Sequence, residues 1–340
     1  MFKVYSTRVS KVTLISDVSI IKTRLFSSSQ SLKNQINNVI LDPFFITGIS
    51  DAEGSFVCIV RKNTDLRLGW RTEVVFQIGL HKKDLDLLKS IKAYFGNVGI
   101  ISENNKENMC AFRISSPKQI LDYVIPHFDN YPLITQKQAD YILFKNIVEL
   151  MLKKEHLNSE GLKKIISIRA SLNLGLSDTL KEAFPDTKPV IRPIVTNQEI
   201  PHPQWVSGFA TGEGCFFVKI TKGRNIAGVG VQILFQLSQH TRDTKLLNNL
   251  SNFFNCGKYI QTPNKEWGYF QCTKFLDNYE IIKPFFEKYP IKGIKFKDFK
   301  DWSKVGDMIK NKEHLTLGGV SKILHIKSGM NTGRTLDFEE

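Results

Sequence analysis

The chain has 340 residues, of which 47 are Lys or Arg and 33 are Asp or Glu, so its formal net charge is +14. This length exceeds one comfortable hydrophobic core and favours two domains, while no uninterrupted apolar run approaches the roughly 18 residues of a membrane-spanning helix. The excess positive charge favours a polyanionic partner, although charge alone does not separate a nucleic-acid-binding protein from any other basic protein.

Residues 1–40 differ in composition from the rest of the chain, since they are rich in Ser and basic residues and contain a single acid, Asp17. Such a stretch is typical of an amphipathic mitochondrial transit peptide. Arg24 stands shortly before Ser27, as an arginine does before a mitochondrial processing site. A disordered tail, or the remnant of a fused upstream exon, is the alternative interpretation. We therefore expect this N-terminal extension to direct the protein to the mitochondrial matrix.

One long segment of the chain occurs twice. Residues 45–56 match residues 205–216, and the correspondence continues at nearly constant spacing. Later matches pair Phe76 with Phe235, Tyr131 with Tyr289, Glu155 with Glu313 and Asn173 with Asn331. Chance matches do not hold their register over about 130 residues, so the sequence indicates a duplication.

Two copies are too few for a solenoid and favour a monomer with pseudo-twofold symmetry. We expect a first repeat over residues 41–175 and a second over residues 204–335. Between them, residues 176–203 contain five prolines and are interpreted as a linker.

Within each copy the expected order is a helix, two strands, a helix, two strands and further helices. Residues 72–80 and 229–238 alternate between apolar and polar side chains, as strands with one buried face do. Residues 82–95 and 241–254 have apolar side chains at helical spacing. The predicted fold class is α+β, built from two αββαββα repeats with antiparallel sheets.

The first element of each copy is a helix, predicted over residues 43–53 and 203–213. A proline is tolerated at its start, and Gly54 and Gly214 stand where helices commonly end in a left-handed residue. Glycine inside a soluble helix costs about 1 kcal/mol relative to alanine, so small residues one turn apart indicate close packing. An ordinary crowded site would explain one such stripe, but the duplication favours two helices that pack on each other. The stripes consist of Gly48, Ala52, Gly208 and Gly212.

A glutamate follows each stripe, as Glu53 and Glu213. A carboxylate at a helix C-terminus faces the negative end of the macrodipole, and two of them side by side repel each other. A bound cation reverses both penalties, and oxygen ligands without His or Cys indicate Mg²⁺. Paired acids with metal suit phosphodiester cleavage. A surface cap would explain one acid, but its occurrence in two equivalent places favours function.

Residues 46–54 and 206–214 resemble the nine-residue signature of LAGLIDADG homing endonucleases. The resemblance extends over about residues 43–334 and is greatest to single-chain fungal mitochondrial members encoded in group I introns. It implies that Glu53 and Glu213 are the metal-binding catalytic acids. Asp51 keeps the acid usual at the sixth position and Thr211 does not, which suggests capping or packing at that position. The resemblance also implies double-strand cleavage of a long, asymmetric DNA site across the minor groove, with β-saddles in the flanking major grooves.

Supporting residues vary within the family, and three candidates stand out. Gln239 fits a water-organising position, where the first copy has Leu80. Lys137 and Lys295 follow the Tyr-Pro turns in equivalent places and would stabilise phosphate charge. Each lysine is equally compatible with a solvated position at the start of a helix.

The polar faces of the strands supply candidates for reading DNA, since Arg pairs with guanine edges and Gln with adenine edges. A solvated sheet face explains any single residue, but the scarcity of carboxylates across the set suits a nucleic acid. One saddle is expected to present Arg61, Asn63, Arg71, Glu73, Gln77 and Arg113. The other is expected to present Lys219, Thr221, Gln232, Gln236 and Ser238.

The cysteines show no Cys-x-x-C pair and no nearby histidine pair at metal-ligand spacing. This argues against a zinc site and against a disulfide framework, and free thiols in a reducing compartment are the simplest interpretation. The five are Cys58, Cys110, Cys215, Cys256 and Cys272.

Three functions compete on this scaffold. The first is a Mg²⁺-dependent endonuclease acting on double-stranded DNA, and the second is a maturase that binds a group I intron RNA. The third is a catalytically silent DNA-binding protein. Both Glu53 and Glu213 are intact, which favours cleavage because a purely binding descendant is free to lose them.

Overall fold

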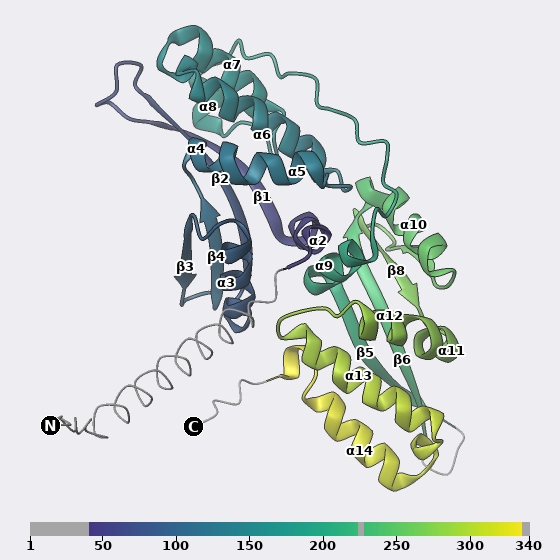
Figure 1. Ribbon diagram of the computed structural model, residues 1–340. Coiled ribbons are helices and arrows are strands. Elements are labelled where there is room, and N and C mark those ends of the chain that lie inside the picture. The colour runs from purple at the N-terminus through teal and green to yellow at the C-terminus, as the bar shows by residue number, and fades with distance from the viewer. Residues whose placement is uncertain (1–40, 224–227, 335–340) are drawn as a thin grey trace, which may run out of the picture. The chain divides into compact units, whose positions relative to one another are not determined.

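The computed structural model describes residues 41–223 and 228–334, and Figure 1 shows its elements. The expected targeting segment, residues 1–40, lies outside the described residues. No helix among those described is long and apolar enough to span a membrane.

The two repeats contain the same elements in the same order. The first consists of α2 (Pro43–Glu53), β1 (Gly54–Lys62), β2 (Trp70–His81), α3 (Leu85–Tyr94), β3 (Ile100–Asn104), β4 (Met109–Ile114), α4 (Pro117–Gln119), α5 (Ile125–Asn130), α6 (Lys137–Leu152) and α7 (Ser159–Ala170). The second consists of α9 (Pro203–Glu213), β5 (Gly214–Lys222), β6 (Val229–His240), α10 (Thr244–Phe254), β7 (Lys258–Gln261), β8 (Trp267–Cys272), α11 (Phe275–Asp277), α12 (Lys283–Lys288), α13 (Lys295–Lys310) and α14 (Leu317–Ser328). The predicted α+β class is confirmed.

Each repeat contains one antiparallel sheet, with strand orders β1-β2-β4-β3 and β5-β6-β8-β7. Their registers are equivalent, because Gly54 lies opposite Ile78 and Gly214 lies opposite Leu237. The helices cover one face of each sheet, with α6 on β1 and α13 on β5 (Figure 1). The other face carries the more polar side chains of each strand, as the alternation predicted.

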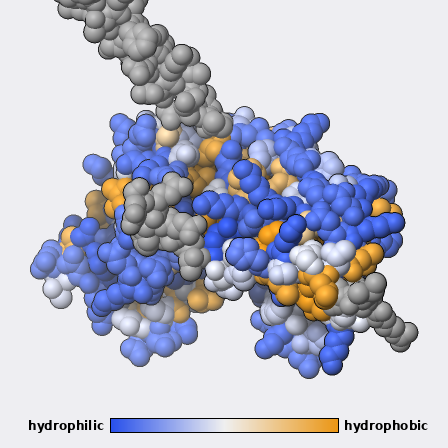
Figure 2. Space-filling view, turned by 90° about the horizontal axis from the view of Figure 1, so that it is seen from below, coloured by the Kyte–Doolittle hydropathy of each residue, from blue (hydrophilic) through white to orange (hydrophobic). Residues whose placement is uncertain are grey.

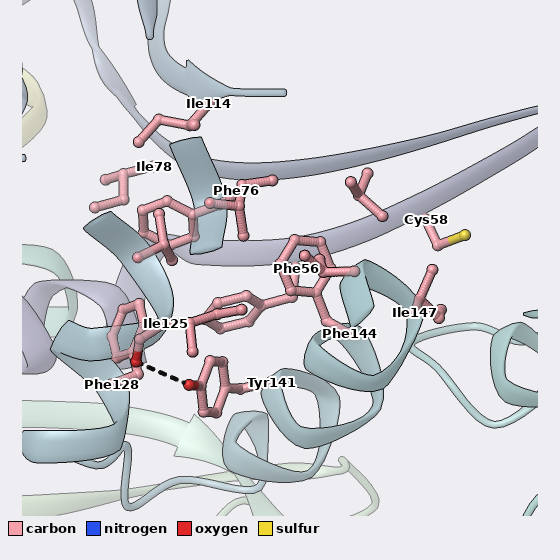
Figure 3. Close-up of a cluster of buried hydrophobic side chains, with 14 of the residues drawn as sticks. Phe56, Cys58, Phe76, Ile78, Ile114, Ile125, Phe128, Tyr141, Phe144 and Ile147 are labelled. Atoms are coloured by element: carbon pink, nitrogen blue, oxygen red, sulfur yellow. Dashed lines mark hydrogen bonds between the residues drawn. The ribbon is translucent and has the colours of Figure 1, made fainter. Parts of the chain in front are cut away.

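The sheets are held to their helices by aromatic cores. In the first repeat Phe56 and Phe76 pack with Phe128 from α5 and Phe144 from α6, while the hydroxyl of Tyr141 donates to the Ile125 carbonyl at 3.1 Å (Figure 3). Each buried aromatic ring contributes about 1.5–3 kcal/mol through removal of apolar surface from water. The matching core of the second repeat consists of Phe216, Phe235, Phe286, Phe299 and Trp302.

Helices α2 and α9 lie side by side between the two sheets (Figure 1). A Cβ atom added at Gly48 would lie 2.7 Å from the Phe209 backbone nitrogen, and one added at Gly208 would lie 2.9 Å from the Ile49 nitrogen. Backbone therefore contacts backbone at these two positions. Any larger side chain would separate the helices.

The expectation that each helix ends in a left-handed glycine was wrong. Gly54 has φ −77° and Gly214 has φ −71°, and both lead directly into a strand. A Cβ atom added at Gly54 would lie 2.5 Å from the Ser50 carbonyl oxygen. Glycine is required here by the tight passage from helix to strand and not by a positive φ.

The segment between the repeats is more ordered than a plain linker. It contains α8 (Asp178–Ala183), and the Phe184 ring packs on Trp70 of β2 with centroids 5.2 Å apart. The buried Gln198 amide donates to the Ile134 carbonyl at 3.1 Å and to Asp243 at 2.5 Å. The segment thus bonds to both repeats.

Substitution Gly48→Ala tests the helix contact. The added methyl group must push α2 and α9 apart, so we expect the free energy of unfolding to fall by about 1–3 kcal/mol. Urea denaturation measures this change. Gly318→Ala, in helix α14 with no atom within 4 Å of an added Cβ, is the matched control and should leave stability unchanged or raise it slightly. An equal effect of both substitutions would contradict the close contact.

Candidate active site

The two glutamates of the repeated helices meet at the ends of α2 and α9. A Cβ atom added at Gly212 would lie 3.1 Å from the Glu53 Oε1 atom, so the Glu53 carboxylate lies beside the residue that precedes Glu213. Burial raises the pKa of Glu53. Burial, together with the charge of Glu53, raises the pKa of Glu213 to about 7. Both acids are therefore desolvated, and they repel each other.

A partly buried lysine lies beside each acid. Lys137, the first residue of α6, donates to the carbonyls of Ser50 at 3.0 Å, Asp51 at 2.8 Å and Ala52 at 3.1 Å. Lys295, the first residue of α13, donates to the Gly212 carbonyl. A cation is favourable at a helix C-terminus, where carbonyl groups lack partners. The lysines therefore complete the ends of the two helices that carry the acids.

The charges of these lysines and acids are coupled. Burial lowers the pKa of both Lys137 and Lys295, and the negative charges of Glu53 and Glu213 oppose that effect. Both lysines are partly buried and donate to helix carbonyls, which argues against a fully solvated position for either one. The two ammonium groups partly offset the repulsion between the glutamates.

The sixth motif position differs between the repeats. Asp51 is fully buried, and its carboxylate accepts from Ile134 N at 3.1 Å, from the Thr135 hydroxyl at 2.6 Å and from the Trp205 indole at 2.8 Å. At the equivalent position, the Thr211 hydroxyl donates to the Ser207 carbonyl and accepts from Lys292 N. Both side chains anchor the chain just before the helix that carries the active-site lysine, which agrees with a capping role.

Two further aspartates act across the repeats. Asp84 of the first repeat accepts from Ile294 N at 2.7 Å, just before α13. Asp243 of the second repeat accepts from Gln136 N at 2.8 Å, just before α6. Each repeat thus fixes the start of the helix that supplies the other repeat's lysine.

Arg242 is a site residue that the sequence did not single out. It lines one hollow together with Glu53, Lys137 and Asn173, although it belongs to the second repeat. Its side chain is half exposed, and its Nε atom lies 3.7 Å from Asp243. The sequence could have pointed to Arg242 through the equivalent triplets 82–84 and 241–243, because each triplet ends in the capping aspartate.

Gln239 lies within strand β6, paired with Gly268, and not past the strand end. Its side-chain oxygen accepts from His240 N at 2.9 Å. Leu80 at the equivalent position is buried, so Gln239 stands on the side of the sheet that faces the core.

The outer face of the first sheet brings most of its predicted residues together. Arg61 lies opposite Arg71, and Glu73 pairs with Arg61 at 2.9 Å and with Arg71 at 2.6 Å. Nearer the paired helices, Gln77 lies opposite Arg113. Asn63 lies outside β1, because it follows Lys62, and its side-chain Oδ1 atom caps the hairpin turn by accepting from Asp65 N at 3.0 Å.

The outer face of the second sheet carries a hydrogen-bonded network of glutamine side chains and a serine. Gln236 donates to Ser238 at 3.1 Å and accepts from Gln271 at 3.2 Å. Lys219 lies opposite Gln232, and Thr221 lies opposite Gly230. Gln271 was missed in the sequence, although it is the counterpart of Arg113 in register. Figure 2 shows that hydrophilic residues cover most of the surface seen in that view.

Comparison with known proteins identifies the family. The model for LAGLIDADG endonucleases matches residues 46–148 and 206–306. The chain belongs to the LAGLIDADG endonuclease family. It is 40% identical over 338 residues to "Probable intron-encoded endonuclease 2" of Neurospora crassa, with 95% of this chain and 74% of the relative covered. It is 38% identical to "Probable intron-encoded endonuclease 3" of the same fungus, covering 89% of this chain and 57% of the relative.

Solved LAGLIDADG structures match the fold. The homing endonuclease I-SmaMI bound to cleaved DNA is 42% identical with a TM-score of 0.85, covering 87% of this chain and 98% of that one. I-GzeII in complex with its DNA target is 44% identical with a TM-score of 0.81, covering 87% and 100%. Both family-matched segments contain most of the paired helix, the whole sheet and the lysine that lies beside the acid.

The raised pKa of Glu213 makes stability depend on pH. The folded-state pKa is about 7 against an ordinary value of 4.5, so the folded chain retains a proton that the unfolded chain releases between these values. The free energy of unfolding therefore falls as pH rises through this window. Glu213→Gln removes the penalty, so at about pH 8 the metal-free variant should be more stable than the wild type by about 1–3 kcal/mol.

Urea denaturation at several pH values measures this difference, which should vanish below the unfolded-state pKa. Glu287→Gln, at an exposed position, is the matched control and should leave the free energy of unfolding unchanged at both low and high pH. A Glu213→Gln variant less stable than the wild type at high pH would overturn the assignment.

Proposed function

We propose that this protein is a site-specific endonuclease that makes a double-strand break in a long, asymmetric DNA target by Mg²⁺-dependent phosphodiester hydrolysis. The observation that carries the proposal is the meeting of Glu53 and Glu213 at two paired helix ends. Two phosphodiesters, one on each strand, require two sets of charged groups. The pseudo-twofold arrangement supplies one acid and one lysine for each.

The donor set fits a hard divalent cation. Among the residues that the structure describes, neither Glu53 nor Glu213 accepts a hydrogen bond, and both acids carry a raised pKa that a bound cation would reverse. Carboxylates, backbone carbonyls and phosphate oxygens are ligands that Mg²⁺ prefers. When bound, the ion would polarise the scissile phosphate and lower the pKa of an attacking water.

The protein's own groups have distinct parts in this chemistry. Glu53 and Glu213 hold the cation and orient the water. Lys137 and Lys295 place positive charge where negative charge develops on the phosphate, while their bonds to helix carbonyls hold them in position. Arg242 adds an exposed positive charge beside Glu53. Gln239 is proposed to organise water at the second repeat alone, so the two strands are cut with unequal support.

DNA recognition is assigned to the polar sheet faces. The arginines and amides of the first sheet and the amide network of the second offer donors and acceptors suited to major-groove edges. That I-SmaMI and I-GzeII are described in complex with DNA supports this assignment. On the first sheet the proposed DNA-contacting residues are Arg61, Asn63, Arg71, Glu73, Gln77 and Arg113. On the second sheet they are Lys219, Thr221, Gln232, Gln236, Ser238 and Gln271.

We further propose that the protein acts as a monomer in the mitochondrial matrix. Residues 1–40 have the composition of a transit peptide. A related protein of Saccharomyces cerevisiae, 24% identical over 226 residues, is named "Uncharacterized mitochondrial protein RF1", and several relatives are named intron-encoded.

The test is cleavage of a randomised DNA target library by the purified full chain with Mg²⁺. We expect Glu53→Gln or Glu213→Gln to reduce cleavage by at least about a hundredfold, because each removes a charge that holds the metal. Binding of a selected target, measured by gel shift, should be largely kept. Glu287→Gln should cleave like the wild type. If the wild type nicks no target while promoting splicing of a group I intron RNA, the maturase hypothesis replaces this one.

Glu73→Gln probes the first sheet. Loss of the carboxylate frees Arg61 and Arg71 for DNA, so we expect tighter binding and a salt dependence of log K steeper by about one unit. Salt titrations of binding measure both. Glu103→Gln, which breaks an ion pair with Lys82 on the opposite side of the same sheet, is the control and should change neither. Unchanged binding in Glu73→Gln would place that face away from DNA.

A further inference from the structure

Three side chains with metal-ligand chemistry gather in the second repeat, outside the catalytic centre. Cys256 lies between α10 and β7, Cys272 ends β8, and Asp277 ends α11. Their ligand atoms all lie within 4.8 Å of one another. Cys272 is fully buried, so its thiol is held in one place.

The separation of the sulfur atoms is that of two ligands on one ion. The Sγ atoms of Cys256 and Cys272 lie 3.9 Å apart. Two thiolates on a tetrahedral zinc ion, with Zn–S bonds of about 2.3 Å, lie about 3.8 Å apart. A disulfide requires a separation of about 2.05 Å, so the two thiols are not bonded to each other.

The first repeat provides an internal comparison. Gly257 and Gly99 have equivalent left-handed conformations, with φ 70° and 72°, so Cys256 corresponds to Val98. Cys272 lies opposite Phe235 as Ile114 lies opposite Phe76. The counterpart of Asp277, at the end of α4, is Gln119. The second repeat therefore has a metal-ligand side chain at all three positions, and the first repeat has none at the equivalent positions, although the surrounding fold is the same.

The chain around these residues is held rigidly. Asn255 and Gly257, which flank Cys256, both have positive φ, and a Cβ atom added at Gly257 would lie 2.5 Å from the Phe270 ring. The buried Asn278 amide donates to the carbonyls of Cys272 at 3.1 Å and Lys274 at 3.0 Å. The ligands are thus positioned before any ion binds, which lowers the entropic cost of binding.

The charges also suit a cation. The positive charge of Lys274 acts on both thiols and favours their negatively charged forms. Two thiolates and a carboxylate carry three negative charges, of which a divalent cation neutralises two and Lys274 offsets the third.

We propose that Cys256, Cys272 and Asp277 form a zinc site, with water in the fourth position, that clamps the α10–β7 connection to the end of β8. Binding replaces the two thiol protons, so each ion that binds to the neutral thiols releases two protons to solvent. The site stabilises the second sheet and takes no part in cleavage. Spacing along the sequence argued against zinc, because a 15-residue gap between the cysteines fits no local motif.

The test uses the purified full chain, kept reduced and stripped of metal, and titrates it with Co²⁺ followed by Zn²⁺. Thiolate-to-Co²⁺ charge-transfer absorption reports on the cysteine site alone, because ions held by Glu53 and Glu213 have no sulfur ligand. We expect one equivalent of Co²⁺ to produce this band and one equivalent of Zn²⁺ to abolish it. Zn²⁺ should also raise the melting temperature, and a chelator should reverse the rise.

Cys256→Ser should lose the band and the Zn²⁺-dependent thermal shift, and Asp277→Asn should weaken binding by about tenfold or more. Cys215→Ser, outside the cluster, is the matched control and should retain both. Circular dichroism establishes that each variant is folded. Absence of the band in the reduced wild type would overturn the proposal. So would a Cys256–Cys272 disulfide found by mass spectrometry in a protein that binds no Zn²⁺ after reduction.

Discussion

The contact between the α2 and α9 backbones at Gly48 and Gly208 governs the rest of the structure. With no side chain between them, the two helices end side by side, and their last residues bring two carboxylates into one buried place. Desolvation and mutual repulsion both disfavour that arrangement, which is why the pKa of Glu213 rises to about 7. The helix pair thus concentrates negative charge where a cation is needed.

The surrounding residues make this concentration of charge tolerable. Lys137 and Lys295 direct their ammonium groups at the carbonyls of the same helix ends, so the positive charge stabilises the helix and the acids together. The lysines are fixed in turn by capping aspartates, and Asp84 and Asp243 reach across to the opposite repeat. Each half of the active site is therefore held partly by the other half, which makes the two repeats one cooperative unit.

Features set by local periodicity could be read from the sequence. The alternation over residues 72–80 and 229–238 predicted the strands that the structure extends to Trp70–His81 and Val229–His240. Alternation around residues 72–80 and in the residues after Glu53 placed Arg61, Arg71 and Gln77 on one face. Predictions at element ends were weaker. Asn63 belongs to a turn, and Gly54 is required by a close approach to Ser50 and not by a left-handed conformation. The residue at which a helix or strand ends depends on contacts with the neighbouring segment, and the periodicity of the sequence does not report those contacts.

The sequence by itself determined the duplication, the α+β class, the small-residue stripes and the two equivalent acids, because each of these follows from residue type at short or repeated spacing. Only the tertiary structure decided that the lysines cap helix ends, that Arg242 lies beside Glu53, and that Cys256, Cys272 and Asp277 gather in one place. These contacts join segments from different elements, and in part from different repeats. Their geometry is set by how the helices pack on the sheets and on each other, which leaves no periodic trace along the chain.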